Sequence, residues 1–344
     1  MRIVLDGMGS DTCPGPEIQA AVEAARQYPD EIFLVGPQET LSRSLEAAGG
    51  SLPNLHLVHA PETITMEDKG LKLALMAKRP NARNTMAVGM DLIKNGQADV
   101  FVTAGNTGGA LATAYYRLGL IEGVERPALS GLFPVKHGHC AVLDIGANPD
   151  CKAEHLFQFA VMGSVYSEKV LGVPSPRLGL ISNGEEPGKG NQLVKETYPM
   201  LQSSGLNFIG NLEGKELFGG QADVAVTDGF TGNVLLKSSE AVAKLLVDLL
   251  REELMSGTRR KIGALMAKPA FDQLRRVLDP GEIGAAPLLG VNGLVFIGHG
   301  RSDARALVNA IRTVRQAVHA DLLQAIRSEI ATRLIPRAAI SEAA

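Results

Sequence analysis

The 344-residue sequence contains few cysteines and almost no excess charge. Its three cysteines, Cys13, Cys140 and Cys151, are odd in number and show no C-x-x-C spacing, so neither a disulfide framework nor a thiolate zinc site is indicated. The formal net charge of -3 provides no basic field for nucleic acid, and we expect no nucleic-acid partner. A protein of the reducing cytoplasm fits these absences best.

A long hydrophobic run is also absent. The longest apolar helical stretch, 241–250, is interrupted by Lys244 and Asp248 and cannot span a bilayer. The strand-like residues 3–5 follow Met1 almost at once and leave no room for the charged and apolar regions of a secretion signal. We therefore expect a cytoplasmic protein, and its 45% hydrophobic content is enough for a large core.

The dinucleotide-binding fingerprint is incomplete. The loop 6–11 contains Gly7 and Gly9 in G-x-G spacing, but it continues Ser-Asp-Thr and lacks the third glycine. We therefore predict that no nicotinamide cofactor binds here. Asp6 and Asp11 in this loop fit turn capping, and contact with a polar ligand group or a metal is the alternative.

A phosphate-binding Walker A motif is also incomplete. In the loop 183–191, three residues rather than four separate Gly184 from Gly188, and Gly190 stands where Ser or Thr is needed. What remains is Lys189 between two glycines, a setting in which a lysine can bind phosphate or stabilise an oxyanion. An exposed lysine on an ordinary turn is the alternative.

Short apolar runs alternate with helix-length segments along the chain. The strand-like runs are 2–6, 32–35, 55–59, 99–103, 140–144, 177–182, 223–227 and 293–297. This alternation predicts an α/β fold in which helices cover both faces of a doubly wound, mostly parallel sheet, giving three layers. Although length alone suggests about two domains, we expect residues 1–344 to form one. In such sheets ligands bind beyond the carboxyl ends of the strands.

One strand, turn and helix start occurs twice. Residues 98–112 align without gaps with 222–236, and 9 of the 15 positions are identical. In the second copy the turn 228–233 precedes a helix expected from Val234, and the N–H groups at a helix start can bind an anion. Two such turns could line one cleft. The alternative is that similar glycine turns recur for steric reasons in any α/β protein.

Asn148 and Asp150 occur where a strand ends and a helix is expected at 152–171. Either side chain fits a helix cap, and ligand contact is the sharper alternative. Cys151 has no histidine beside it in sequence that would activate its thiol. His299, between two glycines, lies in a loop of catalytic type, although a histidine in a turn is more often structural.

A basic amphipathic helical segment is predicted at about 257–280. Over 259–279, six basic residues stand against two acidic ones. Such a segment can lie on an anionic membrane or receive an acidic partner, and a helical hairpin that packs on a second subunit is the alternative. The residues predicted to make the membrane or subunit contact are Arg259, Arg260, Lys261, Ile262, Leu265 and Met266.

Taken together, these loops resemble the PlsX family, the acyl-acyl-carrier-protein:phosphate acyltransferases of bacterial phospholipid synthesis. The resemblance runs through nearly the whole chain and rests on many loops in order. They are Asp6-Gly-Met-Gly-Ser-Asp11, Ala104-Gly-Asn-Thr-Gly108, Asp144-Ile-Gly-Ala-Asn148, Asp150-Cys151, Asn183-Gly-Glu-Glu186, Lys189-Gly190, Asp228-Gly-Phe-Thr-Gly-Asn233, Leu288-Leu-Gly-Val-Asn-Gly293 and His299-Gly300.

The resemblance implies transfer of a fatty acyl group from an acyl carrier protein thioester to inorganic phosphate. We expect no cofactor and identify no metal-ligand residues; whether a metal assists stays open from sequence. The resemblance also implies a fold similar to isocitrate and isopropylmalate dehydrogenases, and a cytoplasmic homodimer that touches the inner face of the membrane. A membrane glycerol-3-phosphate acyltransferase would be a further partner. Lys189 and Asn233 match the family's catalytic positions. The expected substrate-binding or phosphate-binding residues are Asp6, Gly7, Gly9, Asn106, Thr107, Gly108, Asn148, Asp150, Asp228, Gly229, Thr231 and Gly232.

The mechanism expected from these residues is direct attack by phosphate. Lys189 would balance phosphate charge while Asn233 donates a hydrogen bond to the thioester oxygen as it becomes an oxyanion. Three other functions remain open from sequence. They are a phosphate acetyltransferase-like enzyme that uses coenzyme A thioesters, a metal- and NAD-dependent decarboxylating dehydrogenase, and a non-catalytic protein recruited to membranes through 259–279.

Overall fold

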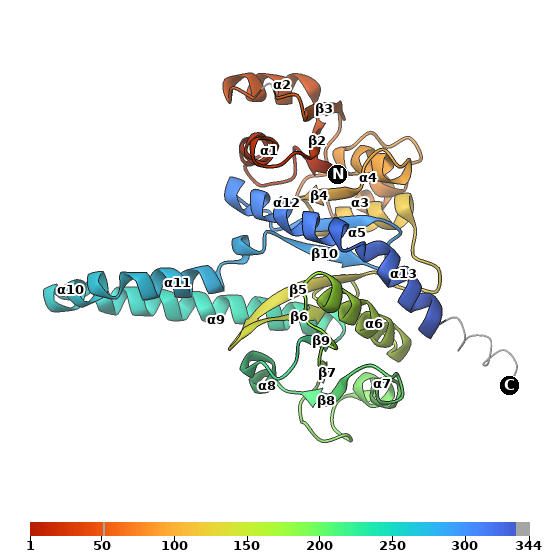
Figure 1. Ribbon diagram of the computed structural model, residues 1–344, viewed down its shortest axis with the longest axis vertical. Coiled ribbons are helices and arrows are strands. Elements are labelled where there is room, and N and C mark those ends of the chain that lie inside the picture. Colours follow the sequence, from red (N-terminus) through yellow and green to blue (C-terminus); the bar gives the residue numbers. More distant parts are fainter. Residues whose placement is uncertain (51, 335–344) are drawn as a thin grey trace, which may run out of the picture.

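The computed structural model describes residues 1–50 and 52–334 and is built on one mixed sheet (Figure 1). In these residues, eleven strands follow the order β3-β2-β1-β4-β11-β10-β5-β6-β9-β7-β8. Their bounds are β1 (Arg2–Asp6), β2 (Glu31–Gly36), β3 (Leu55–His59), β4 (Val100–Thr103), β5 (Ala128–Val135), β6 (Gly138–Leu143), β7 (Leu178–Ile181), β8 (Phe208–Leu212), β9 (Val224–Val226), β10 (Ala285–Leu289) and β11 (Leu294–Gly298).

The sheet is parallel in both halves and antiparallel at its centre. Strands β3, β2, β1, β4 and β11 are parallel neighbours, and so are β6, β9, β7 and β8. Between them, β10 is antiparallel to β11 and to β5, and β5 is antiparallel to β6. Three reversals separate the halves, so their parallel strands run in opposite directions. The predicted mostly parallel α/β sheet is confirmed, and its antiparallel centre was not predicted.

The helices pack on both faces of this sheet or project from it. Their bounds are α1 (Gly15–Gln27), α2 (Gln38–Ala47), α3 (Gly70–Lys78), α4 (Thr85–Lys94), α5 (Thr107–Leu118), α6 (Ala153–Lys169), α7 (Gln192–Gln202), α8 (Gly214–Gly219), α9 (Gly229–Met255), α10 (Thr258–Met266), α11 (Lys268–Leu278), α12 (Ala304–His319) and α13 (Leu322–Arg333), with a 3-10 turn at Pro280–Glu282.

Successive side chains of β1 face opposite layers, which explains the helices on both faces. Ile3 and Leu5 pack in one buried cluster with residues of α1, α6 and α12, whereas Val4 packs in a second cluster with residues of α4 and α5. All three side chains are fully buried. The three-layer arrangement therefore follows from a β1 strand that is apolar on both sides.

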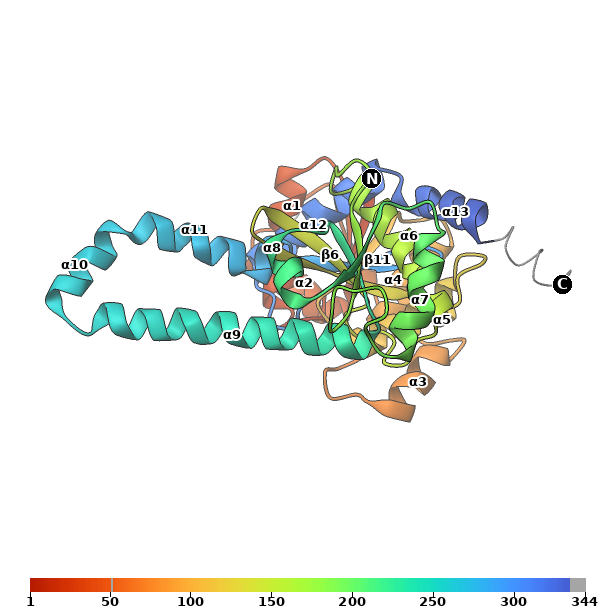
Figure 2. The same ribbon diagram turned by 90° about the horizontal axis from the view of Figure 1, so that it is seen from below.

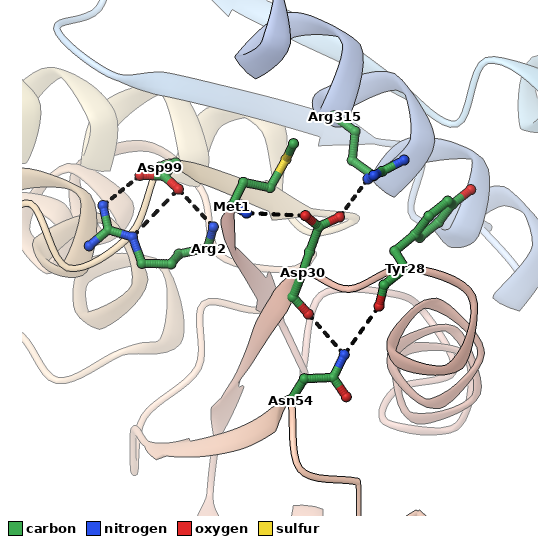
Figure 3. Close-up of polar contacts among 7 residues, drawn as sticks. All are labelled: Met1, Arg2, Tyr28, Asp30, Asn54, Asp99 and Arg315. Carbon is green, nitrogen blue, oxygen red and sulfur yellow. Dashed lines mark hydrogen bonds and ion pairs between the residues drawn. The ribbon is translucent and has the colours of Figure 1, made fainter.

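The buried carboxylate of Asp30 joins the start of the chain to α12 (Figure 3). Asp30 accepts a hydrogen bond from the terminal ammonium of Met1 at 3.1 Å and another from Arg315 on α12. The Arg315 guanidinium also lies 4.1 Å from the ring centre of Tyr28. Asn54 donates to the carbonyls of Tyr28 and Asp30, so one network joins α12, β1 and the chain before β3.

Helices α9, α10 and α11 form a hairpin that projects from the body of the molecule in both views (Figures 1 and 2). The predicted contact residues of α10 are at its tip, where Ile262, Leu265 and Met266 are 58%, 73% and 81% exposed. The helical segment predicted at about 257–280 is present as two helices, α10 and α11. Within the described ranges, no helix is both long and apolar enough to cross a membrane.

Several elements of the fold were not predicted from the sequence. The strands β5, β8 and β10 were missed; β5 and β10 contain Pro134 and Pro287, which interrupt the apolar pattern, and β8 contains Gly210 at φ +105°. Helix α3 lies between the predicted runs 55–59 and 99–103. Asp321 adopts φ +49° between α12 and α13 and so separates the last two helices.

Candidate active site

Three loops follow the neighbouring parallel strands β6, β9 and β7. Because these strands are parallel, their carboxyl ends meet at one edge of the second half of the sheet. The loop after β6 contains Asn148 and Asp150, the turn after β9 leads into α9, and the loop after β7 contains Lys189. These three loops form the candidate active site.

The carboxylate of Asp144 organises the loop after β6. It is fully buried and accepts hydrogen bonds from the backbone N–H groups of Leu129, Gly146, Ala147 and Asn148 at 2.6 to 3.2 Å, and from the Asn148 side chain at 2.9 Å. Burial raises the pKa of Asp144, and the N–H groups of this loop oppose that shift. Five donors on two oxygens hold the loop in one shape.

Asn148 is a structural part of that loop. Its side-chain amide donates to Asp144 and to the carbonyl of Pro127 at 2.6 Å, and the residue is only 7% exposed. Its carbonyl accepts the N–H of Gly229 at 2.8 Å. Asn148 was expected to contact substrate or to cap a helix, and in this structure its amide N–H groups donate within the protein.

Helix α9 begins directly against the Asp144 loop. A Cβ added at Gly229 would lie 2.7 Å from the Asn148 carbonyl oxygen, and one added at Gly232 would lie 1.9 Å from the Asp144 carbonyl oxygen. Only glycine permits this approach of two backbones. The helix therefore starts at Gly229, one turn earlier than the predicted start at Val234.

Asp228 caps this helix. Its carboxylate accepts the N–H of Thr231 at 2.8 Å and the Thr231 hydroxyl at 2.8 Å. The negative charge of Asp228 thus already occupies the amino end of the helix dipole. Asp228, Gly229, Thr231 and Gly232 therefore position α9.

Asn233 lies on the first turn of α9 and faces a pocket of about 370 Å³. Gly146 has φ +142°, and a Cβ there would lie 3.3 Å from the Asn233 amide nitrogen, so the side chain covers the Asp144 loop. Asn233 is exposed, and none of its side-chain atoms makes a hydrogen bond within the described ranges. The pocket is also lined by the apolar side chains of Pro149 and Phe230 and by Lys237.

Lys189 lies on the loop that follows β7, the strand next to β9. Its side chain is exposed, lies against Gly184 and forms no ion pair with another described residue. Gly190 adopts φ +98° and donates its N–H to the Asn183 side chain at 2.9 Å, which shapes the loop. Asp150, in the loop after β6, is exposed as well. Lys189 and Asn233 therefore come from adjacent strand ends.

The remaining predicted residues belong to the first half. Asp6 is buried and accepts from the Met8 N–H and the Thr103 hydroxyl, and burial raises the pKa of its carboxyl. Gly7 donates its N–H to Val35, and a Cβ on Gly9 would lie 2.9 Å from the Gly105 nitrogen. Asp6, Gly7 and Gly9 thus hold the loop after β1 in place.

Asn106 caps α5 by accepting the N–H of Gly109 at 3.0 Å. Its amide nitrogen donates to the carbonyls of Thr65 and Asp68, each at 2.9 Å, and so ties the chain before α3 to α5. Thr107 and Gly108 are exposed at the start of α5.

The two repeated turns do not share the pocket around Asn233. They follow β4 and β9, which have four strands between them in the sheet and run in opposite directions. His299 directly follows β11 in the first half and is within electrostatic reach of Lys237 on α9. Partial burial and the positive charges of Arg301 and Lys237 lower the pKa of His299. Because Lys237 also lines the pocket, the turn after β11 lies near the Asn233 side of α9.

Sequence reasoning missed the parts played by Asp144 and Lys237. Asp144 directly follows a buried strand and precedes a glycine, which is a signal for an acceptor that binds loop N–H groups. Lys237 is four residues after Asn233, and so shares its helix face once the helix is known to start at Gly229.

Three carboxylates near the loop after β7 approach one another closely enough to bind a metal: Glu185, Glu213 and Glu216. The ammonium of Lys215 lies 2.8, 3.4 and 3.3 Å from them. The four charges therefore form an ion-pair cluster, with Glu216 buried and Lys215 exposed, in which the lysine takes the cation's position.

The fold and its strand-end site place the chain in a class of α/β proteins that includes solved acyl transfer enzymes. A phosphotransacetylase from Streptococcus pyogenes superposes with a TM-score of 0.59 at 17% identity, over 93% of this chain and 94% of that one. A 4-hydroxythreonine-4-phosphate dehydrogenase from Klebsiella pneumoniae superposes with a TM-score of 0.50 at 15% identity, over 93% and 99%. These similarities define the fold class.

Sequence comparison identifies the family more specifically than the fold does. Residues 1–325 match the family described as "Fatty acid synthesis protein". Over 331 residues the chain is 46% identical to the phosphate acyltransferase of Acidobacterium capsulatum, covering 96% of this chain and 97% of that protein. The phosphate acyltransferase of Pelotomaculum thermopropionicum is 45% identical, with 96% and 95% covered. The chain therefore belongs to the PlsX family of phosphate acyltransferases, as its loops predicted.

Proposed function

We propose that this enzyme transfers a fatty acyl group from an acyl carrier protein to inorganic phosphate, giving acyl phosphate for phospholipid synthesis. Family membership supports the reaction class. The observation that carries the proposal is the amide of Asn233, which has no hydrogen-bond partner among the described residues and is held against Gly146 at a pocket with apolar walls. A hydrogen-bond donor beside apolar surface suits a thioester carbonyl with an attached acyl chain.

In the proposed reaction, a phosphate oxygen attacks the thioester carbon and forms a C–O bond. The C–S bond breaks, and the pantetheine sulfur leaves as a thiolate that takes a proton from solvent. Asn233 donates to the carbonyl oxygen as negative charge develops on it, and Lys189 balances the charge of phosphate. Since phosphate is already anionic, no residue needs to deprotonate it.

The first half supplies the other proposed substrate contacts. Thr107 and Gly108 are exposed at the amino end of α5, where helix N–H groups lack intrahelical partners and favour an anion. Asp6, Gly7 and Gly9 would support this turn from below rather than touch phosphate, because all three are buried. Asp150 remains a proposed contact in the second half.

The test is acyl phosphate formation, trapped as a hydroxamate, from acyl carrier protein thioester and phosphate. Lys189→Ala and Asn233→Ala should each lower the rate about 10²- to 10³-fold without changing the unfolding temperature. Lys195→Ala and Asn81→Ala, which remove exposed side chains of the same types, serve as controls and should leave the rate unchanged. Near-normal rates for both test variants would refute the assignment.

A coenzyme A thioester is the alternative acyl donor, favoured by the fold shared with phosphotransacetylases. Comparing kcat/KM for the same acyl group on the carrier protein and on coenzyme A decides between the donors. A higher value for coenzyme A would identify a phosphate acetyltransferase-like enzyme. The dehydrogenase alternative predicts NAD-dependent stabilisation and NADH formation, neither of which we expect.

We further propose that the α9–α11 hairpin joins two copies of the chain. An apolar stripe on α9 is about half exposed, and its members follow helical spacing: Val242, Leu245, Leu246, Leu249 and Leu250. A surface of this kind is common where a second helix pair packs. Replacing Leu245 and Leu246 with Ser should convert a dimer to a monomer in light scattering, and an unchanged mass would refute this contact.

At the tip, we propose contact between α10 and an anionic membrane surface. Arg259, Arg260 and Lys261 adjoin the exposed apolar side chains of this helix, the arrangement of an interfacial amphipathic segment. Reversing these three charges to Glu should abolish binding to anionic vesicles while acyl transfer persists. Absence of vesicle binding by the unaltered protein at low salt would refute the contact. In that case, acyl phosphate would have to diffuse through solution to the membrane acyltransferase that consumes it.

We also propose that one catalytic unit spans the chain, because a single sheet continues through both halves. Residues 335–344, included in the predicted domain, lie outside the described residues.

A further inference from the structure

Helix α3 presents an exposed face of mixed apolar and basic character. The outward positions follow helical spacing and comprise Leu71, Lys72, Leu75, Lys78 and Arg79. Leu71 is 76% exposed and Leu75 is 55% exposed. Two leucines one turn apart with three cations beside them form a patch that nothing in the described chain covers.

The opposite face of α3 anchors the helix to α5. Ala77 is 1% exposed, and the Leu73 side chain approaches within 3.4 and 3.5 Å of Cβ positions built on Gly108 and Gly109. The exposed leucines therefore do not result from a helix that lacks a core contact. Burying Leu73 and Ala77 leaves Leu71 and Leu75 pointing outward.

Both ends of α3 are clamped by side chains of α5. At the start, Asn106 donates to the carbonyls of Thr65 and Asp68 at 2.9 Å. At the end, the Arg117 guanidinium donates to the carbonyls of Arg79 at 3.0 Å and Pro80 at 2.9 Å. The outward face is thus held in a set orientation relative to α5, whose amino end is the proposed phosphate site.

Two of the three cations on the outward face have a carboxylate within ion-pair distance, and the third has none among the described residues. Lys72 pairs with Asp68 at 2.6 Å, and Arg79 lies 4.0 Å from Glu62, whereas Lys78 has no ion-pair partner in the described residues. An acidic surface with an apolar cleft would complement this face, since the cations steer the encounter and the leucines lose water on contact.

Position separates this face from the hairpin tip. In both views the tip at α10 projects away from the body, whereas α3 lies against the body, away from that tip (Figures 1 and 2). The outward face of α3 is therefore a surface separate from the hairpin tip. The loop before α3 instead lies beside the turn after β11, because the Met66 side chain lies against Gly300, next to His299.

We propose that the outward face of α3 is the docking surface for the acidic carrier protein that delivers the acyl thioester. The inference rests on the proposed function, since it names the surface by which that donor is recognised. A carrier bound there places its tethered thioester beside α5 and the turn after β11. Docking on α3 contributes to binding of the donor and leaves the chemical step to the pocket residues.

The test compares two acyl donors with the full-length enzyme. One is the acyl carrier protein thioester, and the other is the same acyl group on N-acetylcysteamine, which lacks the protein. Lys78→Glu/Arg79→Glu should lower kcat/KM for the carrier donor about tenfold, through KM, because steering by these charges is reversed. Its kcat/KM for the small donor should stay at the wild-type value. Leu71→Ala/Leu75→Ala should produce the same split without creating a cavity.

A matched control is Arg26→Glu/Arg43→Glu, which reverses two exposed cations on α1 and α2. It should leave both donors unaffected. Equal losses with both donors, or an unchanged KM for the carrier, would overturn the docking surface. So would loss of vesicle binding or of dimer mass in the α3 variants with normal carrier kinetics, since the occupant would then be a membrane or a second copy. If the unaltered enzyme makes no acyl phosphate from either donor, the proposed function fails instead, and carrier binding is then measured directly by calorimetry.

Discussion

The contact between Gly232 and the Asp144 loop predicts a large effect from one added methyl group. In Gly232→Ala, the new Cβ would lie 1.9 Å from the Asp144 carbonyl oxygen, against the 3.4 Å at which ordinary contact begins, a shortfall of 1.5 Å. The obstacle is backbone on both sides, so no side-chain rotation relieves it. The start of α9 must therefore move away from the loop.

Two consequences follow from this displacement. Overpacking of this kind costs about 1–3 kcal/mol of unfolding free energy, although alanine in an unobstructed helix would gain about 1 kcal/mol over glycine. Asn233, the next residue, moves with the helix. Since a misplacement of about 1 Å can lower a rate on the order of 10²-fold, acyl phosphate formation should fall by that factor at temperatures where the variant is folded.

The measurements are thermal unfolding and the hydroxamate assay. Gly214→Ala is the control, because it lies at the start of α8 with nothing within 4 Å of its Cβ, and it should leave the rate unchanged without lowering the unfolding temperature. A Gly232→Ala variant with the wild-type unfolding temperature would show that the two backbones are not in contact. A destabilised variant that keeps the wild-type rate while folded would show that catalysis does not depend on the placement of Asn233.

Three further outcomes are expected. Asp30→Ala leaves the Met1 ammonium and Arg315 without their buried partner, and should cost about 3 kcal/mol in urea unfolding with unchanged kinetics, an expectation that wild-type stability would contradict. Arg177 donates a bidentate hydrogen bond to Asp223 and lowers the pKa of that carboxyl. The pair therefore contributes its full stability at pH values above the ordinary carboxyl pKa of 3.8, and this contribution is lost as the pH falls through the lowered pKa. The stability difference between wild type and Asp223→Asn should thus be largest near pH 7 and vanish in acid; a difference independent of pH would refute it. Burial raises the pKa of the Cys151 thiol to about 12, so Cys151→Ala should keep acyl transfer within a few fold, and a hundredfold loss would implicate the thiol.

Local patterns in the sequence were enough for the fold class and for the loops of the site. The eight strand-like runs became strands, because a stretch buried on both faces must be apolar whatever its neighbours are. The loops containing Lys189 and Asn233 were identifiable because glycines and polar residues at strand ends are local signals. The resemblance to the PlsX family also depended only on loop sequences, and the family match over residues 1–325 agrees with it.

Which polar residues face inward was decided by the tertiary structure. Asn148 and Asp6 look like ligand-binding residues in sequence, yet their hydrogen bonds are made to Pro127, Asp144, Met8 and Thr103 within the protein. Pro127 and Thr103 are distant along the chain from the residues they pair with, and nothing local in the sequence identifies them as partners.

The strand directions and the start of α9 were also tertiary outcomes. Three antiparallel pairings between β11 and β6 reverse the second half, which separates two turns that are nearly identical in sequence. Helix α9 starts at Gly229 because the Asp144 loop and the Asp228 carboxylate bind its first N–H groups. That start places Asn233 and Lys237 on the pocket. Sequence therefore determined the residue types available for the chemistry, and long-range packing decided which of them remain free to perform it.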